Sequence, residues 1–154
     1  MYVYTGPPEL LAHVRPDVMG APITSSADIE GLAPDDEPFT YIVDLEGTLR
    51  VAPRRSEHVA CAGGRPVLAA GEIAFERVHG EWVVTEVSNQ STGYCPGPAS
   101  WPEVAGALDR AGIARPDGFT AAFVFRRCGG CGELNVVKDE HYVCVFCEGG
   151  LSGI

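Results

Sequence analysis

The segment TYIVDLEGTLRVA at residues 40–52 decides the fold of this chain. β-Branched and aliphatic residues dominate both of its ends, and Glu46-Gly47 lies between them as a turn. Two such runs joined by a short turn with glycine are typical of a β-hairpin, and Pro53 ends the second run. The segment therefore predicts two antiparallel strands, at residues 40–45 and 48–52.

A second hairpin is predicted directly downstream. Residues 67–77 and 81–88 carry β-branched and aromatic residues at alternate positions, and His79-Gly80 joins the two runs. Connections this short cannot form the crossover that parallel strands require. We therefore expect an α+β fold with few helices, built on an antiparallel β-sheet core of about four to six strands.

The region before this sheet differs from it in composition. It is rich in proline, so only short helices fit there, and we expect them at residues 9–14 and 27–32. Residues 1–49 also hold nine acidic residues and only one basic residue. We expect residues 1–38 to form an acidic segment that covers the sheet.

One longer helix is expected after the second hairpin. Ser100-Trp-Pro-Glu103 has the form of a capping box with proline in the first turn, and Gly112 ends the helical pattern. Residues 118–127 return to strand character. The central sheet domain is therefore expected to span residues 39–125.

Four of the six cysteines form two Cys-x-x-Cys pairs separated by twelve residues. Two such pairs can place four thiolates around one tetrahedral ion, and Zn²⁺ is its usual occupant. The pattern predicts a zinc ribbon at residues 126–154 with Cys128, Cys131, Cys144 and Cys147 as ligands. The alternatives are disulfide bonds, a redox Cys-x-x-Cys and an iron centre.

Cys61 and Cys95 lie outside this pattern. Each is interpreted as a small buried residue, because a single cysteine in an apolar or glycine-rich stretch usually has that role. Two other interpretations stay open. The first is a nucleophile paired with His58, and the second is a further metal site built from His58 and both cysteines.

The segment RRSEHVACAGG at residues 54–64 predicts an anion site. Arginine forks bind phosphate or carboxylate, and adjacent glycines let backbone N–H groups approach an anion closely. A polar loop at residues 88–96 could complete this site through its hydroxyl groups. The expected ligand-binding residues are Arg54, Arg55, Gly63, Gly64, Ser91 and Thr92. A solvated surface loop and ordinary Ser/Thr turn chemistry are the alternatives.

The order of these features resembles a known module. YIVDLEGTLRVAP, a histidine, Gly-Gly, AAGEIAF and SNQSTGYCP follow one another as in plant calmodulin-binding IQ-motif proteins and some bacterial secreted-toxin chains. The matching positions are His58, Gly63, Gly64, Ala70, Gly71, Ser91, Gly93, Tyr94 and Pro96. Thr92 is an insertion, the loop histidine of that module is missing, and no basic IQ helix is present, so calmodulin binding is not implied. The whole chain resembles an uncharacterised bacterial family with a C-terminal zinc ribbon.

Charge and hydropathy restrict the classes of function. The 154 residues carry a formal net charge of -10, and their mean hydropathy is +0.05. Such an acidic chain repels nucleic acid. No apolar run is long enough to span a membrane, and the N-terminus has no secretory pattern, so we expect a cytoplasmic protein.

The leading hypothesis is a zinc-containing binding or regulatory protein. Its central sheet would hold a small anionic or nucleotide-like ligand or a basic partner protein. The alternative is an enzyme, a transferase or hydrolase acting on a nucleotide-like or acidic substrate. In that enzyme His58 would act as the base, Glu57 or Glu72 would orient it or stabilise charge, and Tyr94 or Arg55 would hold the substrate. A structural subunit of a larger assembly is a third hypothesis.

Overall fold

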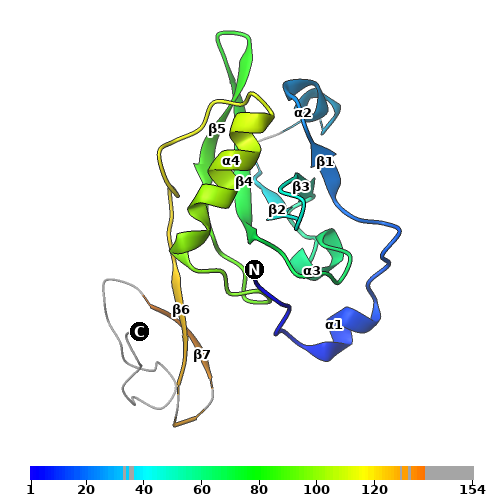
Figure 1. The fold of residues 1–154 in the computed structure, drawn as a ribbon, viewed down its shortest axis with the longest axis vertical. Coiled ribbons are helices and arrows are strands. Elements are labelled where there is room, and N and C mark those ends of the chain that lie inside the picture. The colour runs from blue at the N-terminus through cyan, green and yellow to red at the C-terminus, as the bar shows by residue number, and fades with distance from the viewer. Residues whose placement is uncertain (33, 35–36, 129, 132, 138–154) are drawn as a thin grey trace. The chain divides into compact units, whose positions relative to one another are not determined.

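Five antiparallel strands form the central sheet (Figure 1), in the order β1-β3-β2-β4-β5. The structure is a computed structural model, and it describes residues 1–32, 34, 37–128, 130–131 and 133–137. The strands of the sheet are β1 (Ala21–Ile23), β2 (Phe39–Val43), β3 (Leu49–Ala52), β4 (Ala69–Val78) and β5 (Glu81–Val87). The expected antiparallel sheet with few helices is confirmed.

Short helices accompany the sheet. They are α1 (Pro8–Ala12), α2 (Ser26–Leu32), α3 (His58–Cys61), the 3₁₀ turn η1 (Pro98–Ser100) and α4 (Trp101–Arg110). The helix α4 is the longest of them, and Figure 1 shows it lying across the sheet. None of the helices in the described parts of the chain has the length and apolar character needed to cross a bilayer.

Both faces of the sheet are covered, so strand β2 is buried on both sides. Tyr41 and Val43 point into a core shared with α2 and α4, whereas Ile42 points into a second core shared with α3. Successive side chains of a strand alternate between faces, which explains this division. Because Ala70 also packs in the second core, Glu72, two residues further along β4, lies on the α3 face.

The hairpin of β2 and β3 is confirmed with the pairing Val43↔Leu49. Strand β2 ends earlier than expected, because the carboxylate of Asp44 accepts the backbone N–H groups of Glu46 at 3.0 Å and Thr48 at 2.9 Å. An aspartate that bonds the chain ahead of it forms a turn. Gly47 completes this turn with a φ of 84°.

The N-terminal segment adds a strand to the sheet besides its helices. Strand β1 pairs with β3 over Ala21–Ile23, and Ile23 and Ile29 are both buried in the core shared with α4. The N-terminal segment therefore contributes an edge strand, which the sequence pattern did not predict.

The expected capping box of α4 is wrong in one respect. Ser100 has helical backbone angles, and its hydroxyl donates to the Gly97 carbonyl at 2.7 Å with no cap bond into α4. A capping residue normally has an extended backbone that aims its side chain at the first turn. Here η1 runs directly into α4, so Ser100 cannot reach that turn.

The chain divides into two units, residues 1–122 and 123–154. The second unit contains strands β6 (Val124–Arg127) and β7 (Leu134–Val137), which form a hairpin. The strand expected at residues 118–127 is thus shorter. Thr120 bonds strand β5 without continuing it as a regular strand. Its N–H donates to the Val87 carbonyl at 2.9 Å, but the Val87 N–H donates to the Thr120 hydroxyl at 2.8 Å and not to a backbone carbonyl.

Candidate functional site

His58 begins helix α3 and is anchored to strand β4. Its Nε2 lies 2.8 Å from the carbonyl oxygen of Gly71. A carbonyl can only accept, so Nε2 carries the proton and Nδ1 is the basic nitrogen of the neutral ring. Burial lowers the pKa of His58, and the bond to Gly71 and the charges of Glu72 and Glu57 partly oppose this effect. His58 is therefore held neutral and fixed in one orientation.

Glu72 lies on the same face of the sheet and near an arginine. The Nε of Arg54 is 4.0 Å from a carboxylate oxygen of Glu72, and both side chains are partly exposed. Ion pairs of this kind contribute little to stability. Arg55 is exposed. The two arginines predicted to bind an anion are thus at the surface, and one has a carboxylate neighbour.

Tyr94 is buried and has a structural hydrogen bond. Only 2% of the residue is exposed, and its hydroxyl donates to the Arg65 carbonyl at 2.7 Å. Its ring packs edge to face against Tyr4, with ring centroids 5.7 Å apart. Burial raises the pKa of Tyr94. The hydroxyl thus supports the turn after α3 and does not line the cavity beside His58.

Gly63 and Gly64 end helix α3. Both have positive φ, 63° and 79°, a conformation that glycine adopts readily. Their N–H groups donate to the carbonyls of Ala60 and Val59 at 3.1 and 2.9 Å. These two N–H groups already have acceptors within the helix terminus, so an anion would need other donors.

The loop that follows β5 approaches His58. Thr92 and Gly93 line a small cavity of about 50 Å³ together with Tyr4, Glu57 and His58. The cavity has room for a few water molecules but not for a nucleotide. Ser91 is buried, and its hydroxyl accepts the Tyr94 N–H at 3.3 Å. The expected convergence of His58 with this loop is present, while Arg54, Arg55, Glu72 and Tyr94 do not line the cavity.

The first cysteine pair lies in the turn between β6 and β7. The N–H of Cys128 donates to the Glu133 carbonyl at 2.9 Å, Cys128 is buried and Cys131 is exposed. A Cys-x-x-Cys pair in a turn is the usual half of a tetrahedral four-sulfur site. Cys144 and Cys147 lie outside the described residues. Within the described ranges, no group of three or more potential ligands is placed to hold a metal ion.

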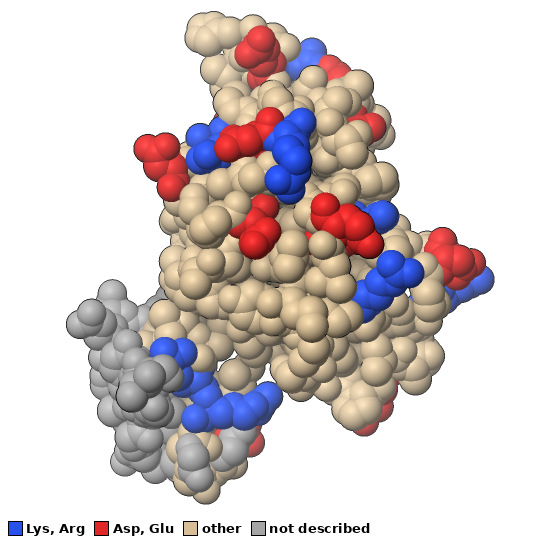
Figure 2. All heavy atoms as spheres, viewed as in Figure 1, with Lys and Arg blue, Asp and Glu red and all other residues tan. Residues whose placement is uncertain are grey.

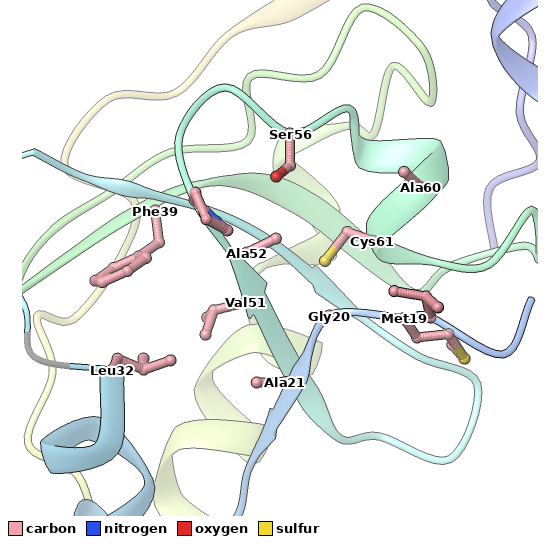
Figure 3. A pocket seen from close by; sticks show the side chains of 12 residues that line it. Met19, Gly20, Ala21, Leu32, Phe39, Val51, Ala52, Ser56, Ala60 and Cys61 are labelled. Carbon is pink, nitrogen blue, oxygen red and sulfur yellow. The ribbon is translucent and has the colours of Figure 1, made fainter. Parts of the chain in front are cut away.

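Sequence reasoning missed a larger cavity beside the β1 edge of the sheet. It has a volume of about 440 Å³, within the range of small-molecule sites. Figure 3 shows Leu32 and Phe39 at one end and Met19 and Cys61 at the other. Its lining comes from the approach to β1, the end of α2, β2, β3 and α3. Because the residues are ordinary apolar ones from distant segments, no local pattern indicates the cavity.

Cys61 has a buried thiol at one wall of this cavity. Burial is the main cause that raises its pKa to about 12, although the charge of Arg50 acts in the opposite direction. Its sulfur packs so closely on Gly20 that a Cβ there would overlap it. Cys61 is thus a neutral, closely packed thiol, as expected for a small buried residue.

The charged side chains do not gather by sign on the visible face of the first unit. Figure 2 shows acidic and basic residues interspersed there. Arg50 pairs with Asp44 at 2.9 Å, and Arg115 pairs with Asp109 at 2.9 Å. Among the described residues of this face, there is therefore no continuous basic surface of the kind that binds nucleic acid. No family model, curated protein or solved structure matches this chain.

Proposed function

We propose that this protein is a binding module whose C-terminal ribbon holds a structural zinc ion through Cys128, Cys131, Cys144 and Cys147. The observation that carries the zinc proposal is the position of Cys128 and Cys131 at the turn of the β6–β7 hairpin. A Cys-x-x-Cys pair between two hairpin strands can bring two thiolates to one side of a metal ion, and the second pair has the spacing to complete the set.

Metal analysis tests the zinc proposal. Protein purified without added metal should contain about one zinc per chain, because a site of four thiolates binds zinc tightly. Cys128→Ser and Cys144→Ser should both lose it. Cys95→Ser is the matched control, since Cys95 lies outside the ribbon, and it should keep the metal. Metal-free protein with an unchanged melting profile would contradict the zinc proposal. If the analysis finds iron, the identity of the metal is wrong but the four cysteine ligands are still supported.

A catalytic role of Tyr94 is disfavoured by the partner of its hydroxyl, which donates to the Arg65 carbonyl at 2.7 Å. A catalytic group must instead reach the reacting atoms directly or through one water. The Nε2 of His58 likewise lies 2.8 Å from the Gly71 carbonyl, so only Nδ1 of this ring could take part in proton transfer. Tyr94 is therefore proposed to support the fold around helix α3.

An anionic or nucleotide-like ligand stays a proposal for the surface at Arg54 and Arg55, with Thr92 as a further candidate contact. A thermal-shift screen with phosphate, nucleotides and dicarboxylic acids tests it, because a ligand that binds only the native state raises the melting temperature. Arg55→Ala should abolish any such shift, and Arg15→Ala, which changes an exposed arginine elsewhere, should not. Equal shifts in both variants would assign the binding to another surface.

An enzyme is the second candidate, and one observation favours it. Glu57 and His58 line the same small cavity, so a base and a carboxylate are neighbours there. Hydrolysis of simple phosphate and acyl esters tests this candidate. Activity that His58→Gln removes and His13→Gln retains would support it, and equal rates in both variants would reject it.

A further inference from the structure

The described part of the lining of the cavity beside the β1 edge is uncharged. Of the described residues that line it, none is acidic or basic, and most are apolar. Val51 and Cys61 are 1% and 2% exposed, so one side of the cavity reaches the protein interior. Transferring an ion from water into such surroundings costs free energy unless the site offers an opposite charge. The described residues of the lining therefore favour uncharged ligands over charged ones.

Hydrogen bonds hold two walls of this cavity in place. The N–H of Gly20 donates to the Cys61 carbonyl at 3.0 Å, and Nη1 of Arg50 donates to the Gly20 carbonyl at 3.0 Å. On the opposite side the hydroxyl of Thr40 lies 3.1 Å from the Ser56 carbonyl. A cavity whose walls are already ordered loses little conformational entropy when a ligand enters.

Ser56 offers one polar group to an occupant. Its N–H donates to the Pro53 carbonyl at 2.8 Å, while its hydroxyl has no hydrogen-bond partner among the described residues. In Figure 3 the hydroxyl oxygen of Ser56 points toward Ala52, whereas the sulfur of Cys61 points toward Gly20. A mostly apolar pocket with a single hydroxyl orients a ligand by one hydrogen bond.

We propose that this cavity binds a small, uncharged and largely apolar molecule with one hydrogen-bonding group, which it places beside Ser56. The inference rests on the proposal that the protein is a binding module. It differs from the anionic ligand expected from the sequence, because the arginines of residues 54–55 do not line this cavity. The hydroxyl of Ser56 can donate to or accept from an alcohol, a ketone or an amide.

A pair of probes that differ in charge tests this proposal. Calorimetric titrations of the full chain would compare naphthalene-2-methanol with naphthalene-2-carboxylate, which share one ring system. We expect the alcohol to bind at least about tenfold more tightly, because the carboxylate would lose its hydration without gaining a partner charge. Ser56→Ala should weaken binding of the alcohol by about three- to tenfold.

Two variants of matched size locate the site. Ala60→Phe fills the cavity from helix α3 and should abolish binding, whereas Ala99→Phe changes an exposed residue outside the cavity and should leave it unchanged. Ser56→Leu also fills the cavity and replaces Ala60→Phe if circular dichroism shows that variant to be unfolded.

The proposal is overturned by any of three results. The first is that the alcohol does not bind wild type at about millimolar concentration. The second is that the carboxylate binds as tightly as the alcohol. The third is that the folded cavity-filling variant binds the alcohol as tightly as wild type does. Zinc content is measured on the same samples. A protein that holds zinc but binds neither probe contradicts this inference alone, and one that binds the alcohol without zinc contradicts only the metal proposal.

Discussion

Gly71 is the residue whose replacement should most disturb the sheet. A Cβ at this position would overlap the Ser88 carbonyl oxygen, which also accepts the Tyr41 hydroxyl at 2.7 Å. We expect Gly71→Ala to lower the free energy of unfolding by about 3 kcal/mol, since buried backbone must move. Gly31→Ala is the control, because a Cβ there meets nothing within 4 Å and alanine favours helix α2. Urea titrations giving equal midpoints would contradict this account.

The neutral state of His58 should make stability depend on pH. Burial lowers its pKa below the ordinary value of 6.5, so the unfolded chain binds a proton more readily than the native protein. The free energy of unfolding should therefore fall as pH drops below about 6.5, by at most about 1.4 kcal/mol per pH unit. His58→Gln should reduce this slope, because glutamine has no titrating ring, and the exposed His13→Gln should not. The prediction is wrong if the free energy of unfolding falls by the same amount between pH 7 and pH 5 in wild type and in His58→Gln.

At the scale of single elements, the β4–β5 hairpin depends on its two turn residues. His79 and Gly80 have φ values of 51° and 82°, and the flanking Val78 and Glu81 are paired. Two positive φ angles are the mark of a type I′ turn, in which asparagine followed by glycine is preferred. We expect His79→Asn to stabilise the protein by about 0.5 kcal/mol and Gly80→Ala to destabilise it by about 1 kcal/mol. Chemical denaturation checks both, and a stabilising Gly80→Ala would exclude this turn type.

At the scale of the whole molecule, the two units should respond differently to loss of zinc. The first unit has two apolar cores of its own, whereas the described part of the second has a small one around Cys128 and Val137. A metal that binds only folded ligands contributes its binding energy to folding. We expect a chelator to expose residues after 122 to limited proteolysis while residues 1–122 keep their protection. Mass spectrometry of the fragments measures this, and early cleavage within the first unit would contradict it.

Several elements were predictable because they depend on neighbours in the chain. The hairpin around Gly47 and the turn at His79-Gly80 follow from local residue types, and the structure confirms both. Local patterns also indicated α2 and α4 closely. The capping role of Ser100 was wrong because the turn before it has its own geometry, which depends on Gly97. The zinc ribbon is predicted by cysteine spacing and stays a prediction.

The candidate site depended more on tertiary structure. Sequence alone determined that the two strands of each hairpin pair antiparallel, because the strand pattern and the length of the turn are local properties and so short a turn excludes a crossover. Only the fold decided that the Gly63-Gly64 N–H groups face helix carbonyls, that the Tyr94 hydroxyl meets Arg65, and that His58 meets Gly71. The apolar cavity likewise arises where Leu32, Phe39 and Cys61 come together from separate segments. The hydrogen-bond partners of these groups and the walls of this cavity come from segments that are distant in sequence. They meet only after the chain has folded, so no local sequence pattern predicts them.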